Sequence, residues 1–112
     1  MTIAKLFRVP RERIKKVLKL GRRLKNGPIT AVLLGNNLNT SRIAVVISSK
    51  AIRKSVVRNK IRRRIKEIFK KIKELLDKNY DVVIIIYSDN RSSFKDLEQL
   101  LFGAFLTAKV IK

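Results

Sequence analysis

Residues 55–78, SVVRNKIRRRIKEIFKKIKELLDK, are the most regular stretch of this sequence and decide its fold. At about 100° per residue, their apolar side chains fall within an arc of about 120°, the width of a buried helix face. The spacing therefore predicts a long amphipathic helix over 55–78, with Ser55 as its N-cap and Asn79 near its end. The apolar positions are Val57, Ile61, Ile65, Ile68, Phe69, Ile72, Leu75 and Leu76.

The remaining arc of this predicted helix is strongly basic. Twelve basic residues lie between Lys50 and Lys73, and the six at positions 58–66 have no acidic residue among them. Like charges on adjacent turns destabilise a helix, so we expect a polyanion outside the chain to compensate them. Nearer the C-terminal end, the spacing predicts ordinary stabilising ion pairs, Glu67 with Lys71 and Glu74 with Lys78.

The composition agrees with a polyanionic partner. The 112 residues carry 28 Lys and Arg but only 8 Asp and Glu, a net charge of +20, whereas solubility alone needs a charge of about 2–8. With 46% hydrophobic residues and no linker, residues 1–112 are expected to form a single domain. The absence of cysteine and histidine excludes disulfides and the commonest general base. No apolar run of about 18 residues and no secretion signal is present, so we expect a cytoplasmic protein that does not enter membranes.

The other segments predict an α+β fold. Residues 10–20 have helical spacing, with Pro10 in the first turn and Gly21 at the end. The β-branched runs 29–34 and 42–48 are separated by GNNLNTS and are expected to pair as an antiparallel hairpin, with a short strand near 22–25 before them.

The C-terminal third completes the pattern. Residues 81–87, DVVIIIY, are continuously apolar, as in a strand covered on both faces. Ser93 and Asp96 match a capping box for a last helix, whose apolar face would include Phe94 and Leu97. The predicted order is αβββαβα, with helices packed on one mixed sheet.

An active site in the protein itself is not predicted. The serines lack a histidine base, and the carboxylates show no spacing that would converge on metal ions about 4 Å apart. We therefore expect no catalytic residue and no metal site among the eight carboxylates, which are Glu12, Glu67, Glu74, Asp77, Asp81, Asp89, Asp96 and Glu98.

The segment 49–69 resembles the basic Arg-Asn region of bacterial ribonuclease P protein components. The pattern runs Arg58-Asn59-Lys60, then an apolar residue, the basic pair Arg62-Arg63 and a further basic residue at Lys66. The resemblance implies an α+β sandwich with a four-stranded mixed sheet, like one domain of a ribosomal protein, and a left-handed βαβ crossover.

The resemblance also implies a function. Such proteins are subunits of ribonuclease P that bind its catalytic RNA and the 5′ leader of precursor tRNA. The RNA performs the cleavage with Mg²⁺ that it mainly binds itself, and no other protein partner is required. The expected RNA interface, including Arg53 and Lys54 from the same basic run, is Lys50, Arg53, Lys54, Arg58, Asn59, Lys60, Arg62, Arg63 and Lys66.

A cleft for the leader is expected between the first helix and the sheet. Relatives commonly carry stacking aromatics at three of its positions, where this chain has Ile14, Leu18 and Val32, while the basic Lys15 is retained. Because stacking contributes about 1–3 kcal/mol per base, leader binding here is expected to depend more on phosphate contacts and apolar packing. Plain core packing remains the alternative for Ile14 and Leu18.

Other functions stay open at this point. A structural RNA-binding protein of the ribosome or of another ribonucleoprotein would have the same charge. A DNA-binding protein is less consistent, because no helix-turn-helix spacing is present. A basic helix on a membrane surface is also less consistent, because the apolar arc of 55–78 lacks Trp.

Overall fold

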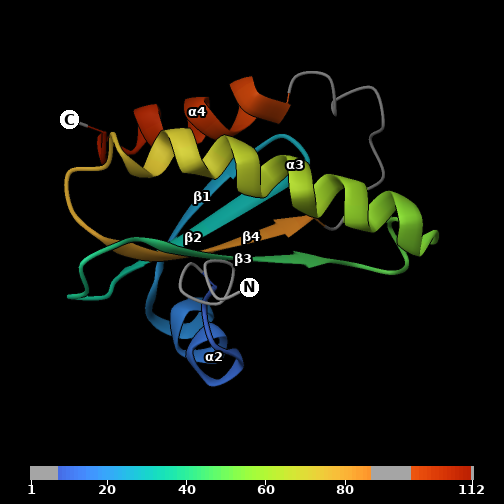
Figure 1. The fold of residues 1–112 in the computed structure, drawn as a ribbon, viewed down its shortest axis with the longest axis horizontal. Coiled ribbons are helices and arrows are strands. Elements are labelled where there is room, and N and C mark those ends of the chain that lie inside the picture. The colour runs from blue at the N-terminus through green and yellow to red at the C-terminus, as the bar shows by residue number, and fades with distance from the viewer. Residues whose placement is uncertain (1–7, 87–96, 112) are drawn as a thin grey trace.

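The computed structural model describes residues 8–86 and 97–111 and confirms the predicted αβββαβα order (Figure 1). The predicted capping residues Ser93 and Asp96, and Phe94, lie outside the described residues. In chain order the elements are α2 (Arg11–Leu20), β1 (Arg22–Asn26), β2 (Ile29–Gly35), β3 (Arg42–Ile47), α3 (Ser55–Lys73), β4 (Tyr80–Ile86) and α4 (Leu97–Thr107).

The described strands form one four-stranded mixed sheet in the order β1-β2-β4-β3. β4 is antiparallel to β2 and parallel to β3, so the predicted hairpin between residues 29–34 and 42–48 is wrong. Strand β4 takes the place between them, because its continuous apolar run over residues 82–86 is best buried at the centre of a sheet. The hairpin instead joins β1 and β2 through Gly27, whose φ is +60°.

The loop after β2 passes over the start of β4 rather than turning back to pair with β2. The Asn36 backbone N–H donates to the Asn79 carbonyl at 3.2 Å, and the Asn79 side chain donates to the Leu38 carbonyl at 2.6 Å. The chain thus reaches β3 one strand further on. From there α3 carries it back to β4, the long crossover that a parallel pair requires.

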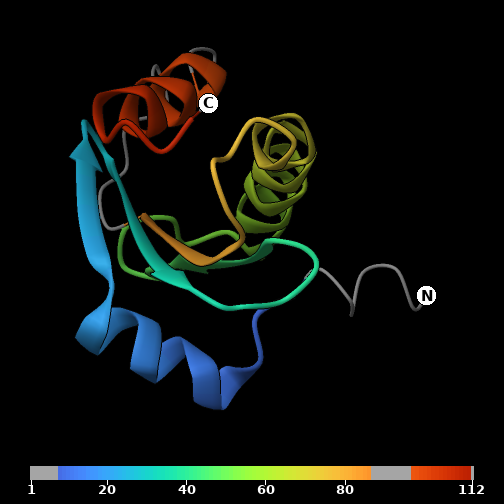
Figure 2. The same ribbon diagram turned by 90° about the vertical axis from the view of Figure 1, so that its left-hand side faces the viewer.

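The sheet separates two helical layers (Figure 2). α3 and α4 cover one face and bury the larger apolar cluster, in which Ile65, Ile72 and Phe105 have no exposed surface. Of the described helices, α2 is the one on the other face, where Val17 packs over Val32 and Val83. Both faces of β4 are therefore covered, as its continuous apolar run predicts.

The ends of α3 differ from the prediction. Lys54 is the N-cap, without a side-chain hydrogen bond, and Ser55 is already helical. The helix ends at Lys73 rather than near Asn79, because Leu76 is buried by an antiparallel bridge to Ile111 instead of by another helical turn. The pair Glu74–Lys78 is therefore not on a helix.

The other predicted ion pair, Glu67 with Lys71, is also replaced. Lys71 Nζ contacts Glu98 Oε1 of α4 at 3.2 Å instead of Glu67. This contact joins the two helices on the same face of the sheet. Because both side chains are largely exposed, it contributes at most about 1 kcal/mol.

Gly21 ends α2 as predicted, but for a different reason. Its φ is −73°, a value open to any residue. A Cβ at this position would lie 2.5 Å from the Val17 carbonyl oxygen and 2.7 Å from Val32 Cγ1. Glycine therefore allows the close approach of α2 to β2, and Pro10 precedes the helix as its N-cap.

Candidate nucleic-acid interface

The buried and exposed faces of α3 agree with its sequence pattern. Ile61, Ile65, Ile68, Phe69 and Ile72 are buried against the sheet. Leu75, which was also predicted to be buried, lies beyond the end of the helix and is 43% exposed. Outside this arc the predicted RNA-binding side chains Asn59, Lys60, Arg63 and Lys66 are exposed, while Arg58 and Arg62 are half-buried.

The loop before α3 presents three further predicted residues in a fixed turn. The backbone N–H groups of Ala51 and Ile52 both donate to the Ser48 carbonyl. Arg58 Nη1 donates to the carbonyls of Ile52 and Arg53, at 2.8 Å each. Arg58 thus braces the loop from the first turns of the helix, a role that the sequence analysis missed. The loop's exposed cations are Lys50, Arg53 and Lys54.

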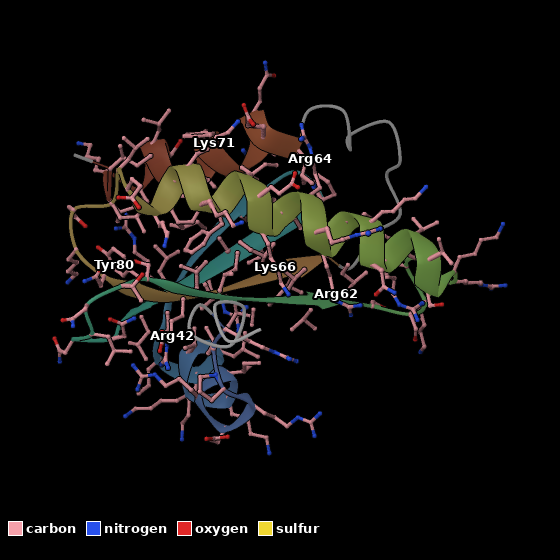
Figure 3. All side chains as sticks on the ribbon, in the orientation of Figure 1. Arg42, Arg62, Arg64, Lys66, Lys71 and Tyr80 are labelled. Carbon is pink, nitrogen blue, oxygen red and sulfur yellow. The ribbon has the colours of Figure 1, made fainter. Side chains whose placement is uncertain are left out.

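Arg62 and Lys66 lie on one flank of α3, and Arg64 and Lys71 on the flank nearer α4 (Figure 3). Arg62 Nη1 donates to Asn59 Oδ1 at 3.3 Å, so the amide of Asn59 orients this guanidinium. The two flanks therefore offer distinct sets of cations on a single rigid helix.

The flank of Arg62 and Lys66 borders a cleft of about 500 Å³ at the β3 edge of the sheet. The segment before α2 closes one side of it, because the Val9 N–H donates to the Ile43 carbonyl at 3.2 Å. The cleft thus joins α2, β3 and α3. Its lining residues are Arg8, Val9, Pro10, Arg11, Ile14, Ile43, Ala44, Val45, Arg62 and Lys66.

The cations of this cleft repel one another. Burial, followed by the neighbouring guanidinium groups of Arg8 and Arg62, lowers the pKa of Lys66 from its usual value. Within residues 8–86 and 97–111, none of the four lining cations forms an ion pair with a carboxylate. A phosphate group in the cleft would relieve this repulsion and accept hydrogen bonds from the guanidinium groups.

The predicted leader residues are not all in this cleft. Ile14 lines it, and Leu18 is half-buried against the apolar cluster under α2. Val32 is completely buried in that cluster and offers no surface to a ligand. Lys15 is exposed on α2. Arg8 and Arg11 were not predicted, and the basic residues flanking Pro10 were the only signal for them.

No group of three His, Cys, Asp or Glu side chains that could hold a metal ion occurs in the part of the chain that the structure describes. Within the same part, every helix is too short or too polar to cross a membrane.

The fold and this cleft define a basic α+β protein with a mixed sheet and, beside its long helix, a cation cluster that has no carboxylate partner among the described residues. The ribonuclease P family model matches residues 9–109. The chain is 32% identical to the ribonuclease P protein component of Clostridium botulinum strain Langeland, over 86% of this chain and 87% of that protein. It therefore belongs to the ribonuclease P protein component family.

Solved structures support the same relationship. The Staphylococcus aureus RNase P protein superposes with a TM-score of 0.76 and 25% identity, over 95% of this chain and 98% of that one. The Thermotoga maritima RNase P protein gives a TM-score of 0.72 and 25% identity, over 86% and 92%. The mixed sheet with its β3–α3–β4 crossover is thus the fold of this family.

Proposed function

We propose that this chain is the protein subunit of a cytoplasmic ribonuclease P, and that it binds both the catalytic RNA and the 5′ leader of precursor tRNA. The observation that carries the proposal is the cleft in which Arg8, Arg11, Arg62 and Lys66 gather with no carboxylate partner in residues 8–86 and 97–111. A site of this kind fits the phosphodiester backbone of RNA, which supplies the missing negative charge.

The catalytic RNA would bind along α3 and its preceding loop. The buried arc of α3 fixes the helix to the sheet. The backbone that carries its cations is therefore already ordered before they meet phosphates. Asn59 and the arginines add hydrogen bonds that a lysine stripe alone would not provide, including bonds to 2′-hydroxyl groups. The braced loop continues this surface with Lys50, Arg53 and Lys54.

The leader would lie in the cleft between α2 and the β3 edge. Ile14, Ile43 and Val45 offer apolar surface, and the cations offer phosphate contacts. Among the described residues, no aromatic side chain lines this cleft, so its described walls offer a base no stacking partner. Binding of the leader should accordingly depend on charge more than on base identity.

Cleavage chemistry would belong to the RNA and to Mg²⁺ held mainly by it. The protein groups nearest the proposed RNA are cations, which repel Mg²⁺ rather than ligate it. Several carboxylates have other partners: Asp81 contacts Arg42 and Arg13, and Asp77 accepts a bond from the Tyr80 hydroxyl. The protein assists by neutralising phosphates and positioning the substrate.

The salt dependence of RNA binding tests this proposal. If about six to eight phosphates are neutralised, a plot of log K for the catalytic RNA against log salt should have a slope of about −4 to −7. Filter binding over a range of KCl concentrations measures it. A slope near zero would show that the basic surface does not carry the binding.

A further inference from the structure

The buried carboxylate of Asp81 connects three parts of the fold. Its side chain has no exposed surface. Arg42 of β3 grips both oxygens, with Nε to Oδ1 and Nη2 to Oδ2 at 2.7 Å each. Asn36, in the loop after β2, donates to Oδ1 at 3.0 Å. Arg13 of α2 donates through Nε to Oδ2 at 2.8 Å.

Arg13 is the polar anchor of α2 on the sheet. Besides Asp81, its Nη2 donates to the Gly35 carbonyl at 3.1 Å, so one planar guanidinium spans the ends of β2 and β4. The apolar anchoring of α2 is modest, because Val17 is its only fully buried residue. At the other end of the helix, Arg23 of β1 donates to the Leu18 carbonyl at 3.1 Å.

The position of α2 determines one wall of the cleft. Arg11 and Ile14, which line it, directly flank the stretch that Arg13 anchors. Movement of this turn would displace both lining residues while leaving the β3 and α3 walls in place.

We infer that Arg13, held by Asp81 and the Gly35 carbonyl, is a positioning residue that sets the α2 wall of the cleft and thereby the affinity for a single-stranded 5′ leader. This inference rests on the proposed function, since it assumes that the leader occupies the cleft. It assigns to Arg13 no direct contact with RNA.

Arg13 can be replaced without leaving Asp81 unpaired. In an Arg13→Met variant, Arg42 still binds both carboxylate oxygens and Asn36 still binds Oδ1. Methionine keeps an unbranched apolar stem in place of the arginine stem. Lys16→Met is the matched control, because Lys16 is exposed on the same helix and its loss removes the same charge.

The test compares two precursor tRNAs, one with a long leader and one with a short leader, for binding to the protein assembled with catalytic ribonuclease P RNA. The readout is the ratio of the short-leader Kd to the long-leader Kd, here called the leader preference. We expect Arg13→Met to lower the leader preference by at least about threefold and Lys16→Met to leave it unchanged. Arg13→Lys should restore part of it, because an ammonium group can reach the carboxylate but lacks the planar fork.

The outcomes separate the inference from the function beneath it. If the wild-type protein shows no leader preference, the proposed leader binding is wrong and the inference falls with it. If the wild type shows the preference and Arg13→Met keeps it, only the inference is wrong. An equal loss of affinity for both tRNAs in Arg13→Met would assign Arg13 a purely structural role and would also overturn the inference.

Discussion

Replacing Arg62 and Lys66 together by alanine will weaken binding of the catalytic RNA by roughly thirtyfold near 0.15 M salt. The estimate follows from counterion release, in which each neutralised phosphate contributes about 0.9 to the salt slope and hence about fivefold in affinity at that salt. The slope should also become less negative by about two. Filter binding with the same RNA over a KCl series measures both quantities.

The opposite flank of α3 supplies the matched control. Arg64→Ala with Lys71→Ala removes the same charge from the same helix, but on the side nearer α4 (Figure 3). The Lys71–Glu98 contact that it removes is exposed and contributes little to stability. We expect this control to lose much less affinity than the Arg62 and Lys66 variant. Equal losses would mean that the protein attracts RNA by total charge and that the cleft flank has no special role.

Replacing Asp81 by alanine will lower the free energy of unfolding by about 3 kcal/mol, because it leaves Arg42 and Arg13 without their shared partner inside the fold. Both arginine side chains are mostly buried, at 18% and 24% exposure, so water compensates them only in part. Urea denaturation at neutral pH, followed by circular dichroism, measures the difference. Glu67→Gln, which removes an exposed carboxylate from α3, should change stability by less than about 0.5 kcal/mol.

The difference in unfolding free energy between wild type and Asp81→Ala should depend on pH in a defined direction. Burial raises the pKa of the Asp81 carboxyl, but the hydrogen bonds from Arg42, Asn36 and Arg13 outweigh it, so the pKa lies below its usual value. Its contribution to stability is therefore present above the unfolded-state pKa of about 3.9 and lost as the pH falls through the folded-state value. The stability gap between wild type and Asp81→Ala should narrow below pH about 4. A stability gap that stays constant as the pH falls below about 4 would contradict the role given to the carboxylate.

Local patterns in the sequence predicted the elements more accurately than their pairing. The spacing of Ile61, Ile65 and Ile72 identifies the buried arc of α3, and the run at 81–86 identifies a strand buried on both faces. The pairing of β2 with β4 rather than with β3 follows from the apolar cover available on each side of each strand. The apolar cover of each strand depends on the whole chain, so periodicity within one segment cannot predict it.

The site was predicted in the same uneven way. Because α3 must bury its apolar arc, the sequence locates most of the exposed cations that we propose as its RNA-binding residues. Arg8 and Arg11 were missed because backbone contacts of Arg8 and Val9 with Ile43 bring this part of the chain to the cleft, and such contacts have no signature in the side chains. Val32 was placed in the cleft by resemblance, yet its side chain packs against the cluster under α2.

The most direct test of the central proposal is cleavage of precursor tRNA by a bacterial ribonuclease P RNA at limiting Mg²⁺, with and without this protein. If the protein is the subunit proposed here, adding it should restore accurate removal of the 5′ leader at Mg²⁺ concentrations where the RNA alone is nearly inactive. The protein without RNA should cleave nothing. Tight RNA binding without any restoration of cleavage would contradict the proposal and favour a structural RNA-binding role in another ribonucleoprotein.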